Sequence, residues 1–315
     1  TPSKGYFHCF GCQTGGDVIA FLMKIDHLTF TETIERLADR IGYTLRYDEN
    51  SSGPVVTSST RNRLIAAHAE AAKFYQNLLN TSPSAAHGRE LLTKRGFDKV
   101  ACEMFGVGYA PNEWDGLTKH LRAIGFTIDE LETAGLSKMG ERGPIDRFRN
   151  RLTWPIKDIS GDVVGFGARK LASDAEDQGP KYLNTPETPI YKKSQVLYGL
   201  DMAKKEIAKK RQVVVVEGYT DVMACHLAGV TTAVATCGTA FGDDHIRILN
   251  RMLGNASTPA EVIFTFDPDA AGQKAAMRAF EDSHKFSAHT FVAIGPNGLD
   301  PSDLRQSQGD EAVRL

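Results

Sequence analysis

In Val213-Val214-Val215-Val216-Glu217-Gly218-Tyr219-Thr220-Asp221, an apolar run ends abruptly in a carboxylate. A second stretch of the same form follows it, Ile263-Phe264-Thr265-Phe266-Asp267-Pro268-Asp269-Ala270-Ala271-Gly272. Short runs rich in Val, Ile and Phe are typical of buried strands in a parallel sheet. Because ligands bind outside the carboxyl ends of such strands, we expect Glu217, Asp267 and Asp269 to converge on one edge of the sheet.

Strands and helices alternate around these two stretches. The pattern predicts strands over 213–217, 230–235, 261–267 and 288–294. It predicts helices over 199–210, 219–228, 242–252 and 270–282. This alternation indicates βαβ units, and therefore an α/β fold with a parallel sheet and helices on both of its faces.

The carboxylates at the strand ends predict a site for divalent cations. Clustered carboxylates repel one another unless a cation neutralises them, and Mg²⁺ or Mn²⁺ suits their oxygen ligands. One residue separates Asp267 from Asp269, so an extended backbone places both side chains on one side. Alternatively, strands end in Asp or Glu because loops are polar or because helices need N-terminal charges. That second explanation also fits Asp221.

Charge is divided unevenly along the chain, although the net charge is only −2. Residues 1–60 sum to −2, residues 61–211 to +6 and residues 212–315 to −6. A basic middle beside an acidic end indicates a surface for a polyanion next to a surface for metal ions. Ordinary variation of surface charge is the alternative that composition leaves open.

Length and composition favour a soluble intracellular protein with a sizeable core. The chain has 315 residues and 41% hydrophobic content, which gives room for about two domains. It has no apolar run of the roughly 18 residues that a membrane span needs and no signal peptide, so no membrane partner is expected. The cysteines are too few and too scattered for a disulfide framework, and they are Cys9, Cys12, Cys102, Cys225 and Cys237.

Near the N-terminus, helix signals flank a stretch of linker composition. Thr29-Phe30-Thr31-Glu32 is a capping-box pattern, which predicts that a helix begins there and ends before Gly42. Residues 49–60 have the composition of a flexible linker. A second helix is predicted over 61–80, because Leu64, Ala67, Ala71 and other apolar residues follow helical spacing.

The two acidic stretches together resemble the Toprim fold, in which a Glu-Gly stretch and an Asp-x-Asp stretch supply the metal ligands. The resemblance implies that Glu217, Asp267 and Asp269 are catalytic and hold two or more Mg²⁺ or Mn²⁺ ions, with Asp221 in a supporting role. Toprim domains occur in bacterial primases, some topoisomerases and some nucleases. The residues before the Glu-Gly stretch therefore decide between these families.

The start of the chain is similar to the second half of a primase zinc ribbon, over Lys4-Gly5-Tyr6-Phe7-His8-Cys9-Phe10-Gly11-Cys12-Gln13-Thr14-Gly15-Gly16-Asp17. Cys9 and Cys12 have metal-ligand spacing. The family's other two ligands, a Cys and a His, would precede Thr1. We therefore expect Zn²⁺ in the full-length protein but no well-formed zinc site in this chain. A redox pair or a chance occurrence is the alternative for a lone Cys-x-x-Cys.

The middle of the chain carries the motifs that are most specific to one family. Asp146-Arg147-Phe148-Arg149-Asn150-Arg151 and Gly161-Asp162-Val163-Val164-Gly165-Phe166-Gly167-Ala168-Arg169 precede Pro180-Lys181-Tyr182-Leu183-Asn184-Thr185-Pro186-Glu187-Thr188. In this order they closely resemble the RNA-polymerase domain of bacterial DnaG-type primases, and the resemblance covers essentially the whole chain. It implies a mixed α+β basic subdomain before the Toprim-type sheet.

The resemblance also implies the domain boundaries. A partial zinc-ribbon domain spans 1–48 and a linker spans 49–60. The basic N-terminal subdomain of the RNA-polymerase domain spans 61–195, and the Toprim metal-binding subdomain spans 196–295. Residues 296–315 begin a C-terminal helical subdomain, so both ends of the chain are expected to be cuts in a longer protein.

Basic and aromatic residues of the middle segment are candidates for binding DNA or nucleotides. Arg147, Arg149 and Arg151 alternate, so they would share one face of an extended chain, and arginine forks grip phosphate oxygens. Tyr182 offers a stacking surface, and Asn184 an amide for a ribose or base edge. The candidates are Arg95, Arg147, Arg149, Arg169, Lys181, Tyr182, Asn184 and Lys193. From the residues alone, a solvated basic face with Arg–Asp pairs through Asp146 or Asp158 explains them equally well.

The chain departs from the family pattern at two acidic motifs. Pro268 stands between Asp267 and Asp269, where the family usually has Gly, which stiffens the turn but keeps both carboxylates. The third motif reads Asp300-Pro301-Ser302-Asp303, where relatives often have Asp-Pro-Asp. Asp300 is therefore the expected extra metal ligand. Asp303 either substitutes for it or caps the following helix.

The resemblance implies a DNA primase, a nucleotidyltransferase that makes short RNA primers from ribonucleoside triphosphates on single-stranded DNA. A monomer at the bacterial replication fork in the cytoplasm is expected, with the replicative helicase binding beyond Leu315. One rival is a Toprim topoisomerase or nuclease, which would cleave DNA. The other is a nucleic-acid-binding module with a vestigial acidic site, which would bind neither Mn²⁺ nor Mg²⁺.

Overall fold

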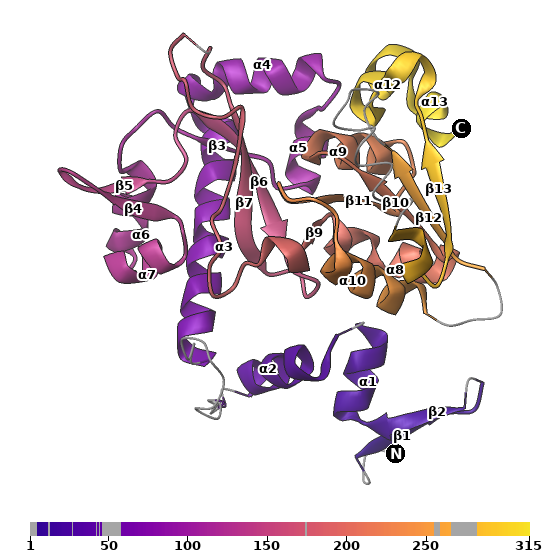
Figure 1. Cartoon of the computed structure of the whole chain (residues 1–315). Helices are drawn as coiled ribbons and strands as arrows, with labels where there is room; N and C mark the ends of the chain where they lie inside the picture. The colour runs from indigo at the N-terminus through magenta and orange to yellow at the C-terminus, as the bar shows by residue number, and fades with distance from the viewer. Residues whose placement is uncertain are drawn as a thin grey trace. The chain divides into compact units, whose positions relative to one another are not determined.

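The computed structural model describes residues 5–11, 13–26, 28–41, 43, 45, 58–173, 175–254, 259–265 and 282–315. The chain forms two compact units, Thr1–Arg63 and Leu64–Leu315 (Figure 1). Several predictions fall outside the described residues: Cys12, the helix stop at Gly42, the linker over 49–57, the Asp267–Asp269 motif and the helix over 270–281. They stay predictions. The last three residues of the predicted linker belong instead to a helix that begins at Ser58.

The first unit is a hairpin followed by two helices. Strands β1 (Tyr6–Cys9) and β2 (Thr14–Asp17) pair antiparallel. Helix α1 (Val18–Ile25) begins where the Asp17 side chain accepts a hydrogen bond of 2.8 Å from the Ala20 amide. Helix α2 (Phe30–Arg40) begins directly after Thr29, as the capping pattern predicts.

Helix α3 (Ser58–Thr81) confirms the long helix that was predicted over 61–80. Its apolar stripe is fully covered, since Leu64, Ala67, Ala71, Tyr75 and Leu79 are all buried. His68 lies on the same stripe with no exposed surface. The helix therefore supplies one wall of the core of the second unit.

An antiparallel sheet of four strands follows, in the order β3-β6-β7-β8. Its strands are β3 (Gly108–Ala110), β6 (Arg151–Lys157), β7 (Val163–Lys170) and β8 (Tyr182–Asn184). A separate hairpin consists of β4 (Ser137–Gly140) and β5 (Gly143–Asp146). The helices of this part are α4 (Ala86–Lys94), α5 (Lys99–Met104), α6 (Gly116–Ala123) and α7 (Ile128–Thr133).

The C-terminal part is built on a five-stranded sheet in the order β13-β12-β10-β11-β9. It contains β9 (Leu197–Tyr198), β10 (Gln212–Val216), β11 (Ala233–Thr236), β12 (Glu261–Thr265) and β13 (His289–Ala293). The last four strands run parallel, as predicted, and only β9 is antiparallel to its neighbour. The prediction for 230–235 began too early, because α9 closes with the Val230 amide bonded to the Cys225 carbonyl.

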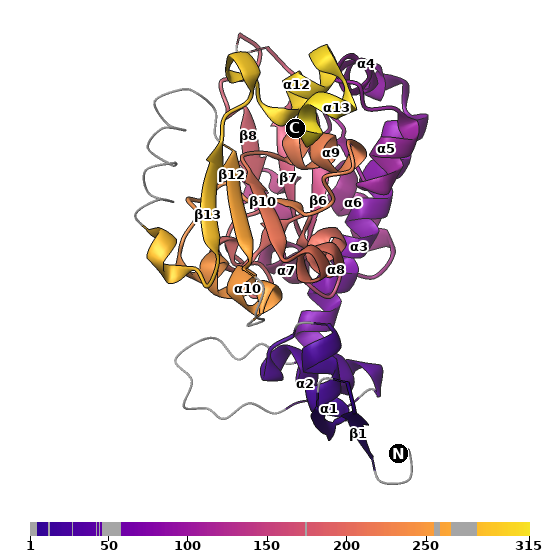
Figure 2. The same cartoon turned by 90° about the vertical axis from the view of Figure 1, so that its right-hand side faces the viewer.

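In the described part of the chain, five helices accompany this sheet. They are α8 (Leu200–Lys210), α9 (Tyr219–Leu227), α10 (Asp243–Leu253), α12 (Pro301–Gln308) and α13 (Asp310–Arg314). Helix α8 packs against β10 and β11, and α12 packs against α9. Figure 2 shows β13, β12 and β10 side by side, with α12 and α13 at one end and α10 at the other. Within the described ranges, no helix has both the length and the hydropathy of a membrane span.

Candidate catalytic and nucleic-acid site

Glu217 lies at the middle of the carboxyl edge of the parallel sheet. It follows β10 directly, and β10 is hydrogen-bonded to β11 on one side and to β12 on the other. The side chain is exposed, while the four valines before it are buried. The sequence places Asp267 two residues after Thr265, the last residue of β12. Glu217 thus occupies the predicted place beside the strand that leads into the Asp267–Asp269 motif.

A cavity of about 400 Å³ opens at this edge. Its lining is largely apolar and reaches back along the sheet to Gln212 at the start of β10, but at the carboxyl edge it includes Glu217, Asp221 and Asp300. Three carboxylates on one cavity are hard oxygen donors of the kind that Mg²⁺ and Mn²⁺ prefer, so the residues present fit a divalent cation. Within the described part of the chain, however, no three His, Cys, Asp or Glu side chains stand close enough to hold an ion without further ligands.

Asp221 lies in the first turn of α9, where sequence analysis allowed a helix-terminal charge. Its Oδ2 accepts a hydrogen bond of 2.9 Å from the Gly218 amide, which fixes the turn directly behind Glu217. One helical turn further on, burial and, to a smaller extent, the Asp221 charge raise the pKa of the Cys225 thiol to about 12. Asp221 therefore supports the backbone of the edge and also faces the cavity.

Asp300 lies at the start of α12, and its carboxylate accepts a hydrogen bond of 2.6 Å from the Asp303 amide. The capping role that sequence analysis offered for Asp303 thus belongs to Asp300. Ser302 is buried, and its hydroxyl lies 3.5 Å from a guanidinium nitrogen of Arg95. Arg95 also lies 3.9 Å from the Asp303 carboxylate. The third acidic motif therefore meets one of the predicted basic residues.

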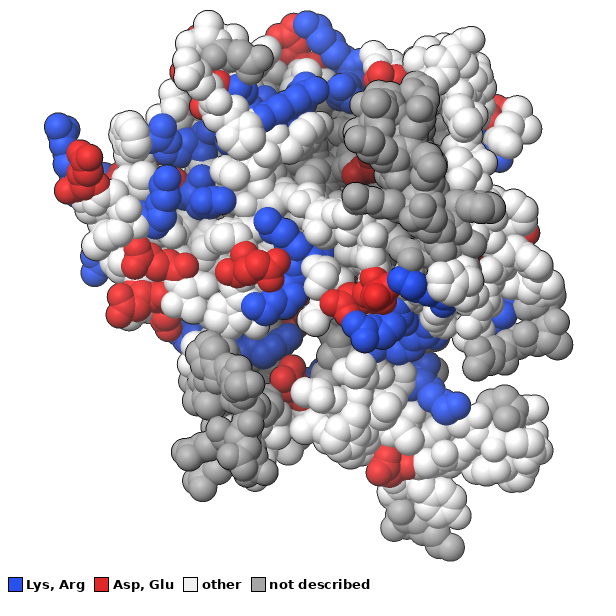
Figure 3. All heavy atoms as spheres, in the orientation of Figure 1, with Lys and Arg blue, Asp and Glu red and all other residues white. Residues whose placement is uncertain are grey.

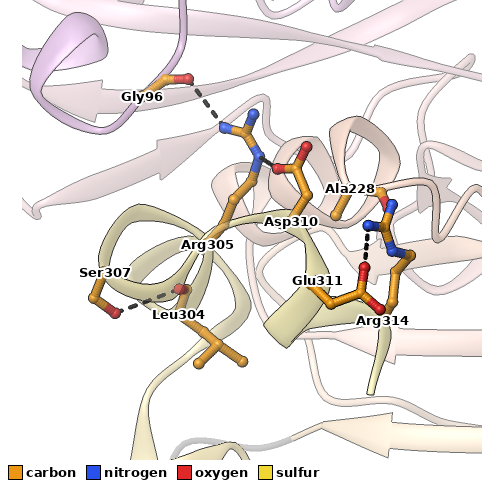
Figure 4. A network of polar contacts seen from close by, with 8 residues as sticks. All are labelled: Gly96, Ala228, Leu304, Arg305, Ser307, Asp310, Glu311 and Arg314. Carbon is orange, nitrogen blue, oxygen red and sulfur yellow. Dashed lines mark hydrogen bonds and ion pairs between the residues drawn. The ribbon is translucent and has the colours of Figure 1, made fainter.

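Helix α12 is attached to the turn after α4 by a small polar network (Figure 4). Arg305 donates to the Gly96 carbonyl at 3.0 Å and to the Asp310 carboxylate at 2.8 Å. Gln306 donates to the Lys94 carbonyl from the next position of the helix. This network, the α12 clasp, holds Asp300 and the Arg95 turn together across 200 residues of sequence.

Tyr182, Arg169 and Arg95 come together beside Asp221. Tyr182 on β8 stands directly opposite Arg169 on β7. Burial of its hydroxyl raises the pKa of Tyr182, whereas the nearby positive charges of Arg169 and Arg95 lower it and the charge of Asp221 raises it. The register places Arg169 beside Tyr182, and the charges of Arg95 and Asp221 also act on the Tyr182 hydroxyl, so residues from distant segments influence one another here.

The predicted shared face of Arg147, Arg149 and Arg151 is wrong. The segment between β5 and β6 is not extended, because Asn150 has a φ of +48°. Arg151 is buried, donates to the Pro180 carbonyl at 2.9 Å and pairs with Asp177. Arg149 stacks on the Trp114 ring at 3.5 Å. Arg147 lies 3.5 Å from the Asn184 carbonyl oxygen, so each arginine has its own surroundings.

The remaining predicted basic residues are spread along β8 and the segment after it. Lys181 is exposed, and its ammonium lies 6.0 Å from the centre of the Tyr182 ring. Lys193 begins a short 3-10 helix, and its carbonyl contacts a ring nitrogen of His245 at 3.1 Å. Figure 3 shows Lys and Arg side chains gathered on this face over β6, β7 and α4.

Sequence analysis missed two aromatic residues. Trp114 is 63% exposed although it is large and apolar, and Arg149 covers one face of its ring. Tyr219, next to the Glu-Gly stretch, donates from its hydroxyl to the Asn184 side chain at 2.8 Å. No spacing rule signals either contact, because both join segments that the chain brings together only on folding.

The N-terminal zinc-ribbon segment holds two of the predicted zinc ligands, Cys9 and Cys12. Cys9 ends β1 with its side chain exposed, and Cys12 lies outside the described residues. Two thiolates leave a tetrahedral zinc site half complete. No other group of metal-binding side chains completes it among the residues that the structure describes.

Family models match three consecutive parts of the chain. A CHC2 zinc finger matches residues 1–53, and the N-terminal domain of the DNA primase catalytic core matches residues 74–204. A Toprim domain matches residues 211–293. These matches indicate zinc and divalent metal ions as the kinds of cofactor of the family.

Curated relatives resemble almost the whole chain. The DNA primase of Streptomyces coelicolor is 64% identical over 313 residues, which cover 99% of this chain and 48% of the relative. The DNA primase of Mycolicibacterium smegmatis is 55% identical over 315 residues, which cover 99% of this chain and 49% of the relative. The chain thus spans about half the length of the curated relatives it matches.

Solved structures agree with the fold. The RNA polymerase domain of Mycobacterium tuberculosis primase DnaG is 55% identical with a TM-score of 0.77, over 81% of this chain and 82% of that one. The same domain in complex with a double-stranded DNA oligomer with a 6-nucleotide overhang is 53% identical, with a TM-score of 0.75, over 81% and 79%. The predicted family and α/β fold class are confirmed: the chain belongs to the bacterial DnaG-type DNA primases.

Proposed function

We propose that this chain is the primer-synthesising part of a DNA primase. It uses single-stranded DNA as the template and ribonucleoside triphosphates as substrates, and it joins them by nucleotidyl transfer. The observation that carries the proposal is the cavity at the ends of β10, β12 and β13, which Glu217, Asp221 and Asp300 help to line, together with the pair of Arg169 and Tyr182 on the antiparallel sheet. A metal-binding edge beside a phosphate-binding group is the arrangement that polymerisation of nucleotides requires.

Carboxylates of the cavity are proposed to hold Mg²⁺ or Mn²⁺. Glu217, Asp267, Asp269 and Asp300 are the proposed ligands, and Asp221 keeps the turn behind Glu217 in place. When bound, two such ions lower the pKa of the attacking 3′ hydroxyl and neutralise the leaving pyrophosphate. Glu217 and Asp300 approach the site from the ends of different elements, so each fixes a different side of it.

Basic and aromatic residues are proposed to bind the template and the triphosphates. Arg169 and Arg95 lie where they can neutralise phosphate charge that grows in the transition state. Lys181, Lys193, Arg147 and Arg149 extend this surface for the DNA backbone, and the exposed Tyr182 ring offers a stacking face. Zn²⁺ is proposed for the complete zinc ribbon. We further propose a monomer that acts at the bacterial replication fork with the replicative helicase.

The test is to incubate the chain with single-stranded template, Mn²⁺ and labelled ribonucleotides and to look for short RNA. Glu217→Gln and Asp269→Asn should abolish synthesis but keep most template binding, because they remove cation ligands only. Glu206→Gln is the matched control, since Glu206 is a surface carboxylate of α8 that pairs with Lys209. It should leave synthesis unchanged.

Three results would contradict the proposal. Equal loss of template binding in Glu217→Gln, Asp269→Asn and Arg147→Ala would remove the division between metal and DNA residues. Cleavage of DNA without incorporation of ribonucleotides would select a topoisomerase or nuclease. Absence of Mn²⁺ binding would favour a nucleic-acid-binding module.

A further inference from the structure

Tyr219 is the first residue of α9 and stands two residues after Glu217. It is buried, with only 5% of its surface exposed. A tyrosine at the start of a helix beside an active edge usually reaches solvent easily, because helix starts lie at sheet ends. Here the side chain instead points back into the second unit, where it contacts the antiparallel sheet.

The ring of Tyr219 lies across one row of that sheet. Trp154 on β6, Gly167 on β7 and Asn184 on β8 stand directly opposite one another in the strand register. Tyr219 stacks on Trp154, with ring centres 5.7 Å apart and planes inclined by 11°. A Cβ at Gly167 would lie 2.2 Å from the Tyr219 ring, so only glycine leaves room for it. We call Trp154, Gly167 and Asn184 the tyrosine seat.

The third member of the seat fixes the tyrosine by a hydrogen bond. The Tyr219 hydroxyl donates to Asn184 Oδ1 at 2.8 Å. Asn184 Nδ2 lies against the backbone of Gly238, where an added Cβ would approach it to 2.2 Å. The Asn184 side-chain oxygen therefore has a protein donor while Nδ2 packs against Gly238, and the Asn184 backbone carbonyl faces Arg147.

We infer that Tyr219 and Asn184 are positioning residues, which hold Glu217 in register with the basic group of the antiparallel sheet. Two residues further along the same strands, and therefore on the same face of the sheet, a second row carries Arg169 opposite Tyr182. Fixing Tyr219 over Gly167 therefore fixes the distance from the start of α9, and from Glu217, to that row. This inference rests on the proposed function, and it replaces the contact of Asn184 with a ribose or base that the sequence suggested.

The test is a double-mutant cycle of Tyr219→Phe and Asn184→Ala, measured by primer synthesis on single-stranded template with Mn²⁺. Each single variant should lower kcat by about three- to tenfold, which corresponds to the loss of one ordinary hydrogen bond. The double variant should lose no more than either single variant, because both act through the same bond. The Kd for template and the KM for ribonucleotides should stay unchanged.

Tyr198→Phe is the matched control. Tyr198 is buried and packs edge-on against Tyr219 at 4.8 Å, so the substitution removes a hydroxyl at the same depth without touching the seat. It should keep the wild-type kcat. Losses that add up in the double variant would overturn the inference. So would a raised KM for ribonucleotides in Asn184→Ala together with a wild-type kcat in Tyr219→Phe.

A readout without catalysis separates this inference from the proposed function. Mn²⁺ affinity of the chain alone, measured by electron paramagnetic resonance, should weaken about threefold in Tyr219→Phe, since Glu217 is then held less firmly. A wild-type chain that makes no RNA would refute the proposed function only. Unchanged Mn²⁺ affinity in the variant of such a chain would overturn the role of Tyr219.

Discussion

At the scale of single residues, His68 ties stability to pH. Its Nδ1 lies 2.9 Å from the Leu64 carbonyl, and its ring stacks on Phe166. Burial lowers the pKa of His68 from 6.5 to about 4, and the bond to Leu64 opposes this only in part. The folded state therefore holds a neutral ring in a range of pH where the unfolded chain binds a proton.

The sign of the effect follows from the lowered pKa. The contribution of neutral His68 to the free energy of unfolding is complete above pH 6.5, the pKa of the residue in the unfolded chain. It is lost as the pH falls towards about 4, the pKa in the folded state. The free energy of unfolding should fall by about 3 kcal/mol between pH 7 and pH 4 from this residue. Urea unfolding across that range measures it, and His68→Leu should flatten the curve.

The control for His68 is His87, which is exposed on α4. His87→Leu should show the same fall in the free energy of unfolding between pH 7 and pH 4 as the wild type. Burial also lowers the pKa of His226 and His245, so some acid loss should remain in His68→Leu. A His68→Leu curve as steep as the wild-type curve would contradict the assignment.

Residue types and spacing predicted Glu217 but not the surroundings of the arginines. The abrupt end of four valines in Glu217 is a local signal that only a strand end explains. The buried pairing of Arg151 with Asp177 depends on a loop 26 residues away in sequence, which no local pattern reveals. The bond between Tyr219 and Asn184 was also not predictable from local patterns, because it joins helix α9 to strand β8 across 35 residues of sequence.

At the scale of elements, the α12 clasp supports the third acidic motif. The Arg305 side chain is 20% exposed and bonds both Gly96 and Asp310, whereas the Arg314 side chain is 48% exposed. Arg305→Ala should therefore lower the free energy of unfolding by about 1 kcal/mol, since it removes the bonds to the Gly96 carbonyl and the Asp310 carboxylate. Chemical unfolding monitored by circular dichroism measures the change.

Arg314→Ala provides the comparison on the neighbouring helix. Arg314 also contacts the Ala228 carbonyl and the Glu311 carboxylate, but its side chain is more exposed to solvent (Figure 4). Its loss should cost no more than about 0.5 kcal/mol. Equal losses in the two variants would show that α12 is not attached through Arg305.

Strongly periodic elements were predictable, and short ones were not. The stripe of α3 and the apolar runs of β10 and β12 carry their own signals, and the structure places them within a few residues of the predicted bounds. Strand β8 has only three residues, and only its pairing with β7 identifies it as a strand. The start of α12 was ambiguous because Asp300 and Asp303 both suit the N-terminal turn of a helix.

At the scale of the whole molecule, the division of charge predicts how template binding depends on salt. Affinity for single-stranded DNA should fall as salt rises, with a slope near −0.7 for each phosphate that a basic residue contacts. Lys181→Ala should weaken binding and reduce the slope by about 0.7. Fluorescence anisotropy at several salt concentrations measures both quantities.

Lys209 supplies the control for this measurement. It is exposed on α8, where it pairs with Glu206 and lies outside β8 and the segment that follows it. Lys209→Ala should leave the slope unchanged. If Lys181→Ala keeps the full slope, β8 does not face the template, and the surface of Figure 3 serves another purpose.

The order of the parallel sheet also has a consequence for synthesis on the ribosome. Strand β10 pairs with β12 through Gln212 and Glu261, which stand 49 residues apart. At translation rates of about 5–20 residues per second, β10 leaves the ribosome roughly 2–10 seconds before this neighbour does. During that interval the edge of β10 that later pairs with β12 has no partner strand. The four valines must then be protected from aggregation with other polypeptides until β12 emerges.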